Sequence, residues 1–224
     1  MSEINYFFTD DFLEAESKLQ SIGKKKIIKK NTIISDINAH PHYSYYIKRG
    51  ICKLNVLDEN GSEKIMCFFG KGSLYPIIIY DQYKVLENYL EFSSITEVEA
   101  YRFPSVMIKE LVSGNPDFAY ACIDYYVRLS GLLLGRSLLN LYNNSTKSVC
   151  SFLYLFYNKN PADPSDEIIG LSQDDIGKIL GLSRVQVSRV LSMLRNDNII
   201  VTNRNNIEIL DFEGLKTYCS DVVE

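Results

Sequence analysis

The segment Ser183–Ser192 carries side chains that can recognise the edges of DNA base pairs. Arg184 and Arg189 each end in a guanidinium group, which can donate two parallel hydrogen bonds to O6 and N7 of guanine. The amide of Gln186 suits adenine, and the side chain of Val185 suits the thymine methyl group. We predict DNA contacts from the outward face and the N-terminal end of one helix, made by Ser183, Arg184, Val185, Gln186, Ser188, Arg189 and Ser192.

Two short helices joined by a tight turn are predicted to position these side chains. Ser172 and Asp175 have the spacing of a capping box, which begins a helix, and Ser183 is suited to cap a second helix. Gly181 can adopt positive φ in the turn, and we expect the small Gly177 to allow a close crossing of the helices. The pattern indicates a helix-turn-helix, with two ordinary packed helices as the alternative. Its second helix has an inward apolar stripe of Val187, Val190, Leu191 and Leu194.

A small β-hairpin is predicted directly after the second helix. Ile199–Thr202 and Ile207–Leu210 would be its strands, with Asn203–Asn206 as the turn. Such a wing lies beside the phosphate backbone of bound DNA. We therefore add Arg204 to the predicted DNA contacts.

The N-terminal half has the two-residue period of β-strands from about residue 24 to residue 103. Asn60-Gly61 is suited to a tight hairpin turn between strands at Lys53–Leu57 and Glu63–Phe69. Short strands at this spacing predict an antiparallel sandwich or barrel. The basic run Lys24–Lys30 is expected to be the exposed side of an edge strand.

Four further helices are predicted around these elements. The first spans residues 9–21, and the second spans residues 104–113 with Pro104 in its first turn. The third is long: Asn115 caps it, and it runs from Pro116 to about Tyr142. Its apolar residues cover more than one stripe, so we expect one side to pack on the β-domain and another on a second copy of the chain. Ser145 is expected to cap the fourth helix.

On these motifs the chain resembles the Crp/Fnr family of bacterial transcription regulators. The stretch YYIKRGICKLNVLDENGSEKIMCFFGKGSL, with Gly50, Gly61 and Gly72 at its turns, is similar to the family's β-roll signature. The stretch LSQDDIGKILGLSRVQVSRVLSMLRNDNII is similar to its DNA-reading motif. The resemblance implies an α+β fold: an N-terminal cyclic-nucleotide-binding-like β-roll, a long dimerisation helix and a C-terminal winged helix-turn-helix.

The resemblance also implies a function and partners. We expect a homodimer that binds a near-palindromic double-stranded DNA operator, and RNA polymerase as a partner if the protein is an activator. The implied domains are an effector-sensing β-roll at residues 1–114, a dimerisation helix at residues 115–143 and a DNA-binding domain at residues 144–224. The chain is thus predicted to be a sequence-specific transcription regulator controlled by a small molecule.

The residues that bind cAMP in this family are replaced here. Pro76-Ile77 stand where the cyclic-nucleotide branch has Gly-Glu, and Asn88-Tyr89 stand where it has Arg-Ser. Leu133-Leu134 stand where the cAMP-binding branch has Thr-Ser. Because no charge remains to hold a phosphate, we expect an effector other than cAMP. The string VSRVL and the aromatic β-roll are similar to the branch that regulates reductive dehalogenation genes, which senses halogenated phenols.

The family's geometry implies an effector pocket between the loop after Leu74, the strand near Asn88 and the long helix. Tyrosines among aliphatic residues suit a small aromatic or apolar ligand with one hydroxyl or carboxylate. The alternative for each tyrosine is core packing with a satisfied hydroxyl. The predicted effector-binding residues are Tyr75, Ile77, Tyr80, Asn88, Tyr89, Tyr125, Tyr126, Leu129 and Leu133.

The sequence indicates no enzyme, metal or cofactor. It has only two histidines and lacks the P-loop, nucleophile-elbow and zinc-protease patterns. His40 and His42 lack an evident third ligand, so a surface turn is expected there and not a metal site. The five scattered cysteines predict free thiols and no iron–sulfur cluster. Cys52 and Cys67 are either small core residues or a redox pair facing each other across the hairpin.

Two alternatives remain open at the level of sequence. The missing phosphate-binding groups allow a constitutive DNA-binding regulator with a non-functional sensor. The net charge of -4 allows a regulatory interaction module that does not bind DNA. With no signal peptide and no long apolar run, we expect a cytoplasmic protein that has no membrane partner.

Overall fold

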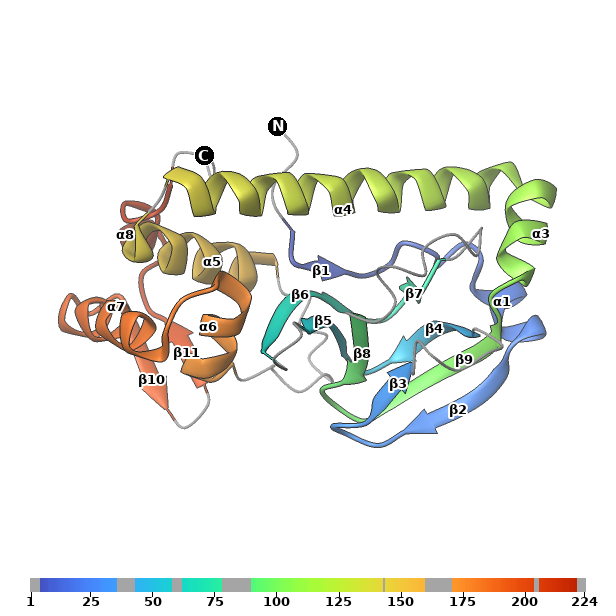
Figure 1. Cartoon of the computed structure of the whole chain (residues 1–224), viewed down its shortest axis with the longest axis horizontal. Coiled ribbons are helices and arrows are strands. Elements are labelled where there is room, and N and C mark those ends of the chain that lie inside the picture. Colours follow the sequence, from blue (N-terminus) through green and yellow to red (C-terminus); the bar gives the residue numbers. More distant parts are fainter. Residues whose placement is uncertain are drawn as a thin grey trace. The chain divides into compact units, whose positions relative to one another are not determined.

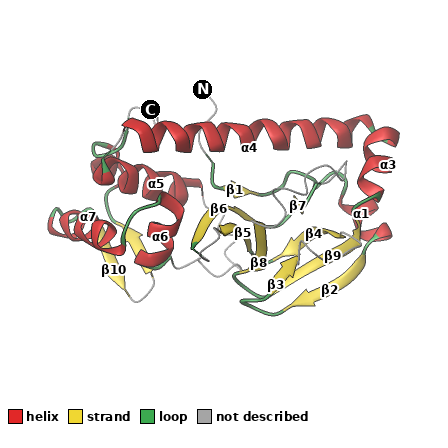
Figure 2. Ribbon diagram, viewed as in Figure 1, coloured by secondary structure: helices red, strands yellow, loops and turns green. Residues whose placement is uncertain are grey.

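The computed structural model describes residues 5–35, 43–57, 62–77, 90–142, 144–159, 171–203 and 206–220. The chain divides into two compact units. One unit is formed by Phe7–Val127, and the other by Met1–Tyr6 together with Arg128–Glu224. Most strands belong to the first unit, and most of the helices after α4 belong to the second (Figure 2).

Two β-sheets form most of the first unit (Figure 1). One has the strand order β1-β6-β5-β8-β3 and the other has the order β2-β9-β4-β7. Neighbouring strands are antiparallel except for the parallel pair β1 and β6. The strands are β1 (Phe7–Phe8), β2 (Lys24–Ile28), β3 (Ile33–Ser35), β4 (Tyr43–Arg49), β5 (Cys52–Leu57), β6 (Glu63–Phe69), β7 (Leu74–Tyr75), β8 (Leu90–Ser94) and β9 (Val98–Pro104).

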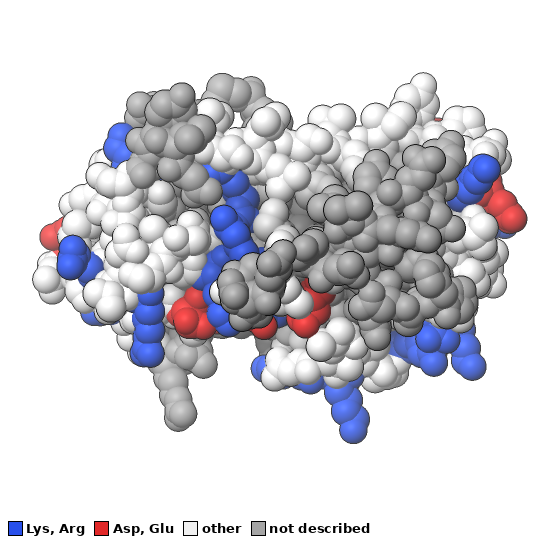
Figure 3. Space-filling view, viewed as in Figure 1, with Lys and Arg blue, Asp and Glu red and all other residues white. Residues whose placement is uncertain are grey.

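The predicted hairpin strands are present as β5 and β6. Leu57 lies opposite Glu63 at the end of the pair, and a β-bulge between Leu54 and Asn55 shifts the register. The turn residues Asn60-Gly61 lie outside the described residues. The strand β2 lies at a sheet edge with Lys24 and Lys25 exposed, as predicted, and Figure 3 shows blue side chains gathered toward the lower right, where Figure 1 places β2.

Among the described residues, three helices belong wholly or partly to this unit: α1 (Glu16–Ile22), α3 (Met107–Gly114) and the first part of α4 (Pro116–Tyr142). The prediction that a helix begins at residue 9 is wrong, since α1 begins at Glu16. Pro104 does not begin a helix either. It is the last residue of β9, and the helix α3 begins only at Met107. Asn115 caps α4 as predicted, its Oδ1 accepting from the amides of Asp117 (3.0 Å) and Phe118 (3.2 Å).

The second unit is a helical domain with a small hairpin. The helix α5 (Ser145–Lys159) contacts α6 (Gln173–Leu180), α7 (Arg184–Asn196) and α8 (Phe212–Lys216). The strands β10 (Ile200–Asn203) and β11 (Asn206–Ile209) pair antiparallel after α7, which confirms the predicted wing. Its core contains Val149, Phe152, Leu153, Phe156, Ile176, Ile179, Val187, Val190, Leu191, Leu194, Ile200 and Leu215.

One predicted cap in this unit is displaced by a residue. Asn144 caps α5, because its Oδ1 accepts from the amide of Lys147 at 2.9 Å, whereas Ser145 is the first helical residue. Among the described helices, none is both long and apolar enough to cross a membrane.

Candidate nucleic-acid interface and effector site

The helices α6 and α7 form the predicted helix-turn-helix with both N-termini capped. Ser172 and Asp175 make a reciprocal capping box: Ser172 Oγ accepts from the Asp175 amide at 3.1 Å, and Asp175 Oδ2 accepts from the Ser172 amide at 3.0 Å. Gly181 ends α6 in the left-handed region, with φ 70° and ψ 31°. A non-glycine residue would be strained there, so Gly181 fixes the angle between the two helices.

Gly177 is needed for a close approach, although the neighbour differs from the predicted one. A Cβ atom at this position would lie 2.6 Å from the carbonyl oxygen of Leu182. Leu182 lies in the turn, so the small residue makes room for the turn backbone. The consequence is the one expected from sequence: a side chain at Gly177 would push the turn away from α6.

The helix α7 separates an inward face from an outward one. Val187, Val190, Leu191 and Leu194 are buried, which confirms the predicted inward stripe. The structure places the predicted contact residues on the other side: Ser183, Arg184, Val185, Gln186 and Arg189 are exposed, and Ser188 and Ser192 are half-buried.

Two properties of this outward face suit DNA. Val185 is 68% exposed although it is apolar, so the face offers a methyl-bearing contact that the fold does not use. No described residue forms an ion pair or hydrogen bond with the guanidinium group of Arg184 or of Arg189. Both guanidinium groups are therefore available to phosphates or base edges.

Gln186 has a second role besides its predicted DNA contact, because it caps the helix α7. Its Oε1 accepts from the amide and from the hydroxyl of Ser183, both at 2.9 Å, which completes a capping box at α7. The spacing Ser-x-x-Gln is a sequence signal for that box. The carbonyl side of the amide is thus engaged, and the exposed amide group of Gln186 keeps its donors.

Arg195 joins α7 to the wing. Its Nη2 donates to Ser192 Oγ at 2.7 Å, and its Nη1 donates to Thr202 Oγ1 on β10 at 3.1 Å. One planar guanidinium group therefore fixes the distance between the outward face of α7 and the hairpin. Sequence spacing gave no signal for this link, because Thr202 lies on a different element.

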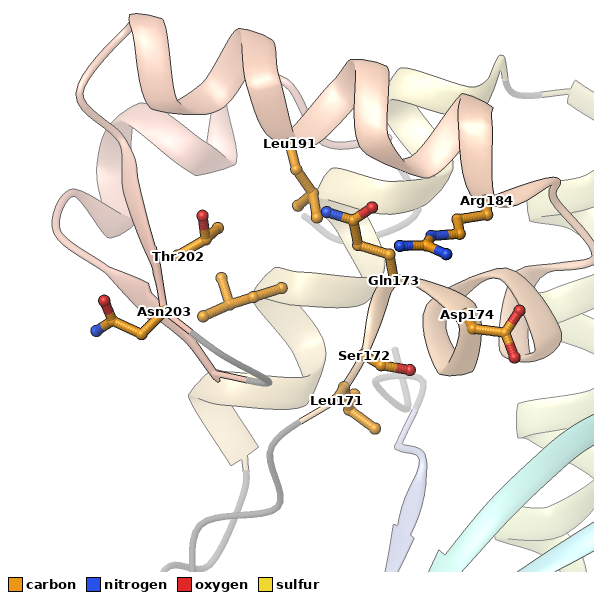
Figure 4. Close-up of a pocket in the computed structure, with 9 residues that line it drawn as sticks. Leu171, Ser172, Gln173, Asp174, Arg184, Leu191, Thr202 and Asn203 are labelled. Carbon is orange, nitrogen blue, oxygen red and sulfur yellow. The ribbon is translucent and has the colours of Figure 1, made fainter.

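A cleft of about 300 Å³ lies between the start of α6, the start of α7 and the wing (Figure 4). In Figure 4 the Arg184 side chain extends toward the Gln173 side chain, and Asn203 lies on the wing side. The predicted wing contact Arg204 lies outside the described residues. The cleft is lined by Leu171, Ser172, Gln173, Asp174, Arg184, Leu191, Thr202, Asn203 and Ile207.

The sequence of this unit matches a known domain family. Residues 147–218 match the model of the Crp-like helix-turn-helix domain. No curated protein sequence matches the chain.

Solved structures extend the likeness of the Crp-like domain to the whole fold. A single-residue variant of CprK complexed with OCPA has a TM-score of 0.72 at 20% identity, over 96% of this chain and 98% of that one. The c-di-GMP responsive global regulator CLP from Xanthomonas campestris has a TM-score of 0.72 at 15% identity, over 88% and 99%. A Crp/Fnr-family transcriptional regulator described as putative, from Eubacterium rectale, has a TM-score of 0.67 at 19% identity, over 93% and 95%. The predicted α+β fold of the Crp/Fnr type is confirmed.

Four of the predicted effector residues lie in the described part of the β-sheet unit, outside the stretch that matches the Crp-like domain. The Tyr75 ring packs against Phe92 and Phe69, with centroids 4.7 and 4.9 Å away. Tyr125 on α4 is buried against Phe8 at 5.0 Å. Burial raises the pKa of the Tyr75 and Tyr125 hydroxyls, so both are neutral at physiological pH.

Tyr126 and Ile77 connect α4 to the end of the described loop after β7. The Tyr126 hydroxyl donates to the carbonyl oxygen of Ile77 at 2.6 Å, while the Ile77 side chain is buried. The Tyr126 ring meets that of Tyr125 edge-on, with centroids 5.2 Å apart. The structure thus brings three tyrosines and Ile77 into one neighbourhood, because the Tyr75 ring packs on Phe69, Phe69 on Phe8, and Phe8 on Tyr125.

The other predicted effector residues are not brought into this neighbourhood by the described structure. Tyr80, Asn88 and Tyr89 lie outside the described residues. Leu129 and Leu133 belong to the second unit, where Leu129 is half-buried and Leu133 is exposed.

The cysteine and histidine hypotheses have different outcomes. Cys52 lies opposite Phe69 and Cys67 lies opposite Leu54, so the idea that the two thiols face each other across the hairpin is wrong. All five cysteines are buried and none forms a disulfide bond, and burial raises the pKa of the Cys52 thiol. His40 and His42 lie outside the described residues, among which no group of three or more metal-ligating side chains occurs.

Proposed function

We propose that this chain is a sequence-specific DNA-binding transcription regulator of the Crp/Fnr type. The observation that supports this most directly is the outward face of α7, where neither Arg184 nor Arg189 has a partner among the described residues, on a doubly capped helix-turn-helix. The match of residues 147–218 to the Crp-like domain supports the same function. The alternative of a module that does not bind DNA has no comparable observation in its favour.

The geometry suggests a division of roles within the interface. Arg189 and Val185 are on the outward face of α7, so we assign them to base edges in the major groove. Arg184 lines the cleft between α6 and the wing, which Gln173 and Asn203 also line, so we assign it to a phosphate group. The two arginines then differ in what they contribute: Arg189 to specificity and Arg184 to general affinity.

This division is testable with two substitutions on one operator, obtained by selection from random DNA. Arg189→Ala should weaken operator binding by about 1–3 kcal/mol and relax specificity at one base pair of each half-site. Arg184→Met should weaken binding to all sequences and reduce the salt slope by about 0.9 for each phosphate that is no longer neutralised. Fluorescence anisotropy titrations at several salt concentrations measure both effects. Identical specificity profiles for Arg189→Ala and the unmodified chain would remove the assigned base contact.

A homodimer is part of the proposal. The helix α4 carries a row of exposed apolar residues at positions i, i+3, i+7, i+14 and i+18, and the first four of these have the spacing of a coiled-coil seam. An exposed row of this kind marks an interaction surface, and a two-fold dimer would present two recognition helices to a near-palindromic operator. The row consists of Tyr120, Ile123, Val127, Leu134 and Leu138.

For the effector we propose a small molecule other than cAMP, bound in the β-sheet unit near Tyr75, Tyr125 and Tyr126. Pro76 and Ile77 supply no charge for a cyclic phosphate, and the Ile77 side chain is buried. Neutral phenol groups can hydrogen-bond a hydroxyl or carboxylate, and the surrounding rings suit an aromatic body. CprK was solved with OCPA and CLP responds to c-di-GMP, so the shared fold does not by itself select the ligand.

One observation favours the second candidate, a constitutive regulator. The rings of Phe69, Tyr75 and Phe92 pack within 5.5 Å of one another and occupy the interior beside the proposed effector site. A thermal-shift screen with phenols, aromatic acids and nucleotides separates the two candidates, because a ligand of the folded state raises Tm by mass action. A hit that Tyr126→Phe weakens supports the gated regulator, whereas unchanged Tm across the screen supports the constitutive one.

The remaining features of the proposal follow from DNA binding. We keep the three predicted parts, residues 1–114, 115–143 and 144–224, as the functional division of the chain. A protein that acts on a bacterial chromosome works in the cytoplasm, and an activator of this kind would also contact RNA polymerase.

A further inference from the structure

Arg136 on α4 is the one charged side chain that is buried among the described residues, with 7% of its surface exposed. It is the only charged residue in an otherwise mostly apolar stretch of α4, GLLLGRSLL. Burying a charge is costly unless hydrogen bonds compensate for the lost water. The contacts of this guanidinium group are therefore informative about the domain.

The first contact is with the helix-turn-helix. Arg136 Nη2 donates a hydrogen bond to the carbonyl oxygen of Ile179. Ile179 lies in the last turn of α6, where carbonyl groups have no partner within the helix and carry the negative end of the helix dipole. The charge of Arg136 thus stabilises the end of α6, two residues before the turn at Gly181.

The second contact is with the N-terminal segment. Arg136 Cζ lies 5.8 Å from the centroid of the Tyr6 ring, within cation–π range. The Tyr6 ring is held edge-on against Phe152 of α5, with centroids 5.0 Å apart at 88°. Burial raises the pKa of Tyr6 to about 12, with Arg136 acting in the opposite direction, so the ring remains neutral beside the guanidinium group.

Tyr6 and Arg136 lie on the two segments that lead to the covalent connections between the units of the chain. The units are joined between Tyr6 and Phe7 and between Val127 and Arg128. Tyr6 is the residue at the first connection, and Arg136 follows the second connection on the same helix, α4. One side chain therefore touches the segment of the first connection, is part of the helix of the second, and binds the helix-turn-helix directly.

We infer that Arg136 is a positioning residue that fixes the orientation of α6 and α7 relative to α4 and the N-terminal segment. A displacement of either connection then reaches the DNA-reading face through one hydrogen-bonded group. This inference rests on the proposed function and adds to it the residue through which recognition is controlled. Arg136 itself is buried and touches no DNA in this account.

The test compares three variants with the full-length chain. Arg136→Met removes the charge and the donors, Arg136→Lys keeps both a charge and a donor, and Lys147→Met removes an exposed charge from α5 as a matched control. The first readout is the ratio of affinities for a selected operator duplex and for a scrambled duplex of equal length. The second is amide hydrogen exchange at Leu180–Ser183, compared with the core of α5.

Arg136→Met should lower the affinity ratio about tenfold or more, since a hydrogen bond to a charged group contributes about 1.5–3 kcal/mol. Exchange at Leu180–Ser183 should accelerate, while exchange in the α5 core stays within about twofold of the unmodified chain. Arg136→Lys should restore the affinity ratio to within about threefold of the unmodified chain, because it retains a charged donor although it lacks the planar guanidinium group. Lys147→Met should weaken binding to both duplexes equally and leave the ratio unchanged.

An unchanged ratio and unchanged exchange in Arg136→Met would overturn the inference, as would equal defects in Arg136→Lys and Arg136→Met. If Arg136→Met does not fold, Tyr6→Leu provides the same test and should lower the ratio about fivefold, the loss expected for one cation–π contact. Failure of the unmodified chain to select any operator would count against the proposed function alone. The exchange measurement needs no DNA, so it decides the positioning role in that case too.

Discussion

Single residues account for the shape of the proposed DNA-binding face, and Gly177 is a tightly constrained one. A Cβ atom there would lie 2.6 Å from the Leu182 carbonyl oxygen, a distance at which backbone must move. By contrast, a Cβ atom at Gly114 would have no neighbour within 4 Å. The two glycines therefore form a matched pair, one packed and one free.

Gly177→Ala should destabilise the folded chain by about 1–3 kcal/mol, the usual cost of forcing an extra group into a packed site. Gly114→Ala should be neutral or stabilising by up to about 1 kcal/mol, because alanine lowers the entropy of the unfolded chain. Urea unfolding measures both values. Equal stabilities for the two variants would show that the turn yields and that Gly177 is not required.

A single ion pair gives a prediction for pH. The hydrogen bond that Lys48 donates to the Glu16 carboxylate, opposed by burial, holds the pKa of Glu16 below its ordinary value. A carboxyl group whose pKa is lowered by folding stabilises the fold above its unfolded pKa, near 4.3, and that stabilisation is lost as pH falls through the lowered pKa.

Glu16→Gln should therefore lower stability at pH 7 by about 0.2–1 kcal/mol, the range for partly exposed pairs. The difference from the unmodified chain should shrink as the pH is lowered through the acidic range. Chemical denaturation at a series of pH values gives the comparison. A difference that persists undiminished in acid would mean that the effect of the substitution does not come from this charge.

Elements whose signals are local could be predicted from sequence, and those set by distant contacts could not. Ser172 with Asp175, and Asn115 before Pro116, mark helix starts because their partners are only two or three residues away. The start of α1 at Glu16 and the role of Pro104 as the end of β9 depend on pairing with the sheets, which no short pattern encodes. The same limit applies to the site: exposed Arg189 follows from helical spacing, whereas the links of Arg195 to Thr202 and of Arg136 to Ile179 do not.

The cap of α6 provides a prediction at this scale. Ser172→Ala removes the hydroxyl that accepts from the Asp175 amide and should cost about 1 kcal/mol. Ser113→Ala in the last turn of α3 exchanges an exposed serine of no capping role and should change stability by about 0.5 kcal/mol or less. Thermal unfolding of both variants separates them. The cap assignment would be contradicted by a larger loss for Ser113→Ala than for Ser172→Ala.

The wing provides another, because Arg195 links it to α7. Arg195→Met should leave α7 folded but accelerate amide exchange in β10 and β11, since the two hydrogen bonds to Ser192 and Thr202 are removed. Arg195→Lys can keep a hydrogen bond to only one of the two partners, so its exchange rates in the hairpin should lie between those of Arg195→Met and the unmodified chain. Hydrogen exchange with mass spectrometry resolves the hairpin from the helix. Unaltered exchange in the hairpin would assign its position to other contacts.

The proposed binding of a near-palindromic operator requires a dimer of the chain. Ile123 on α4 is 59% exposed, and Val106 outside that helix is 71% exposed, so they are a matched pair of apolar surface residues. Ile123→Glu should yield a monomer because a charge would be buried in the seam, whereas Val106→Glu should leave the assembly unchanged. Light scattering after size-exclusion chromatography reports the mass. A monomeric unmodified chain, or a dimeric Ile123→Glu variant, would place the subunit contact elsewhere.

Net charge also matters at this scale, because the chain carries -4 overall. Non-specific DNA binding depends mainly on phosphate neutralisation, so it should be weak and strongly salt-dependent for this protein. In the proposed function, specific recognition then comes from a few side chains on α7 and the wing. Sequence selectivity therefore distinguishes a DNA-binding regulator from a module that does not bind DNA.

The most direct test is selection of bound sequences from a random double-stranded DNA pool by the purified full-length chain. We predict enrichment of a near-palindromic motif whose two half-sites are separated by about one helical turn, roughly 10–10.5 base pairs between their centres. When the selection is repeated with Arg189→Ala, the enriched motif should show no base preference at one position of each half-site. A pool that remains random after repeated rounds at low salt would contradict the assignment of this protein as a DNA-binding regulator.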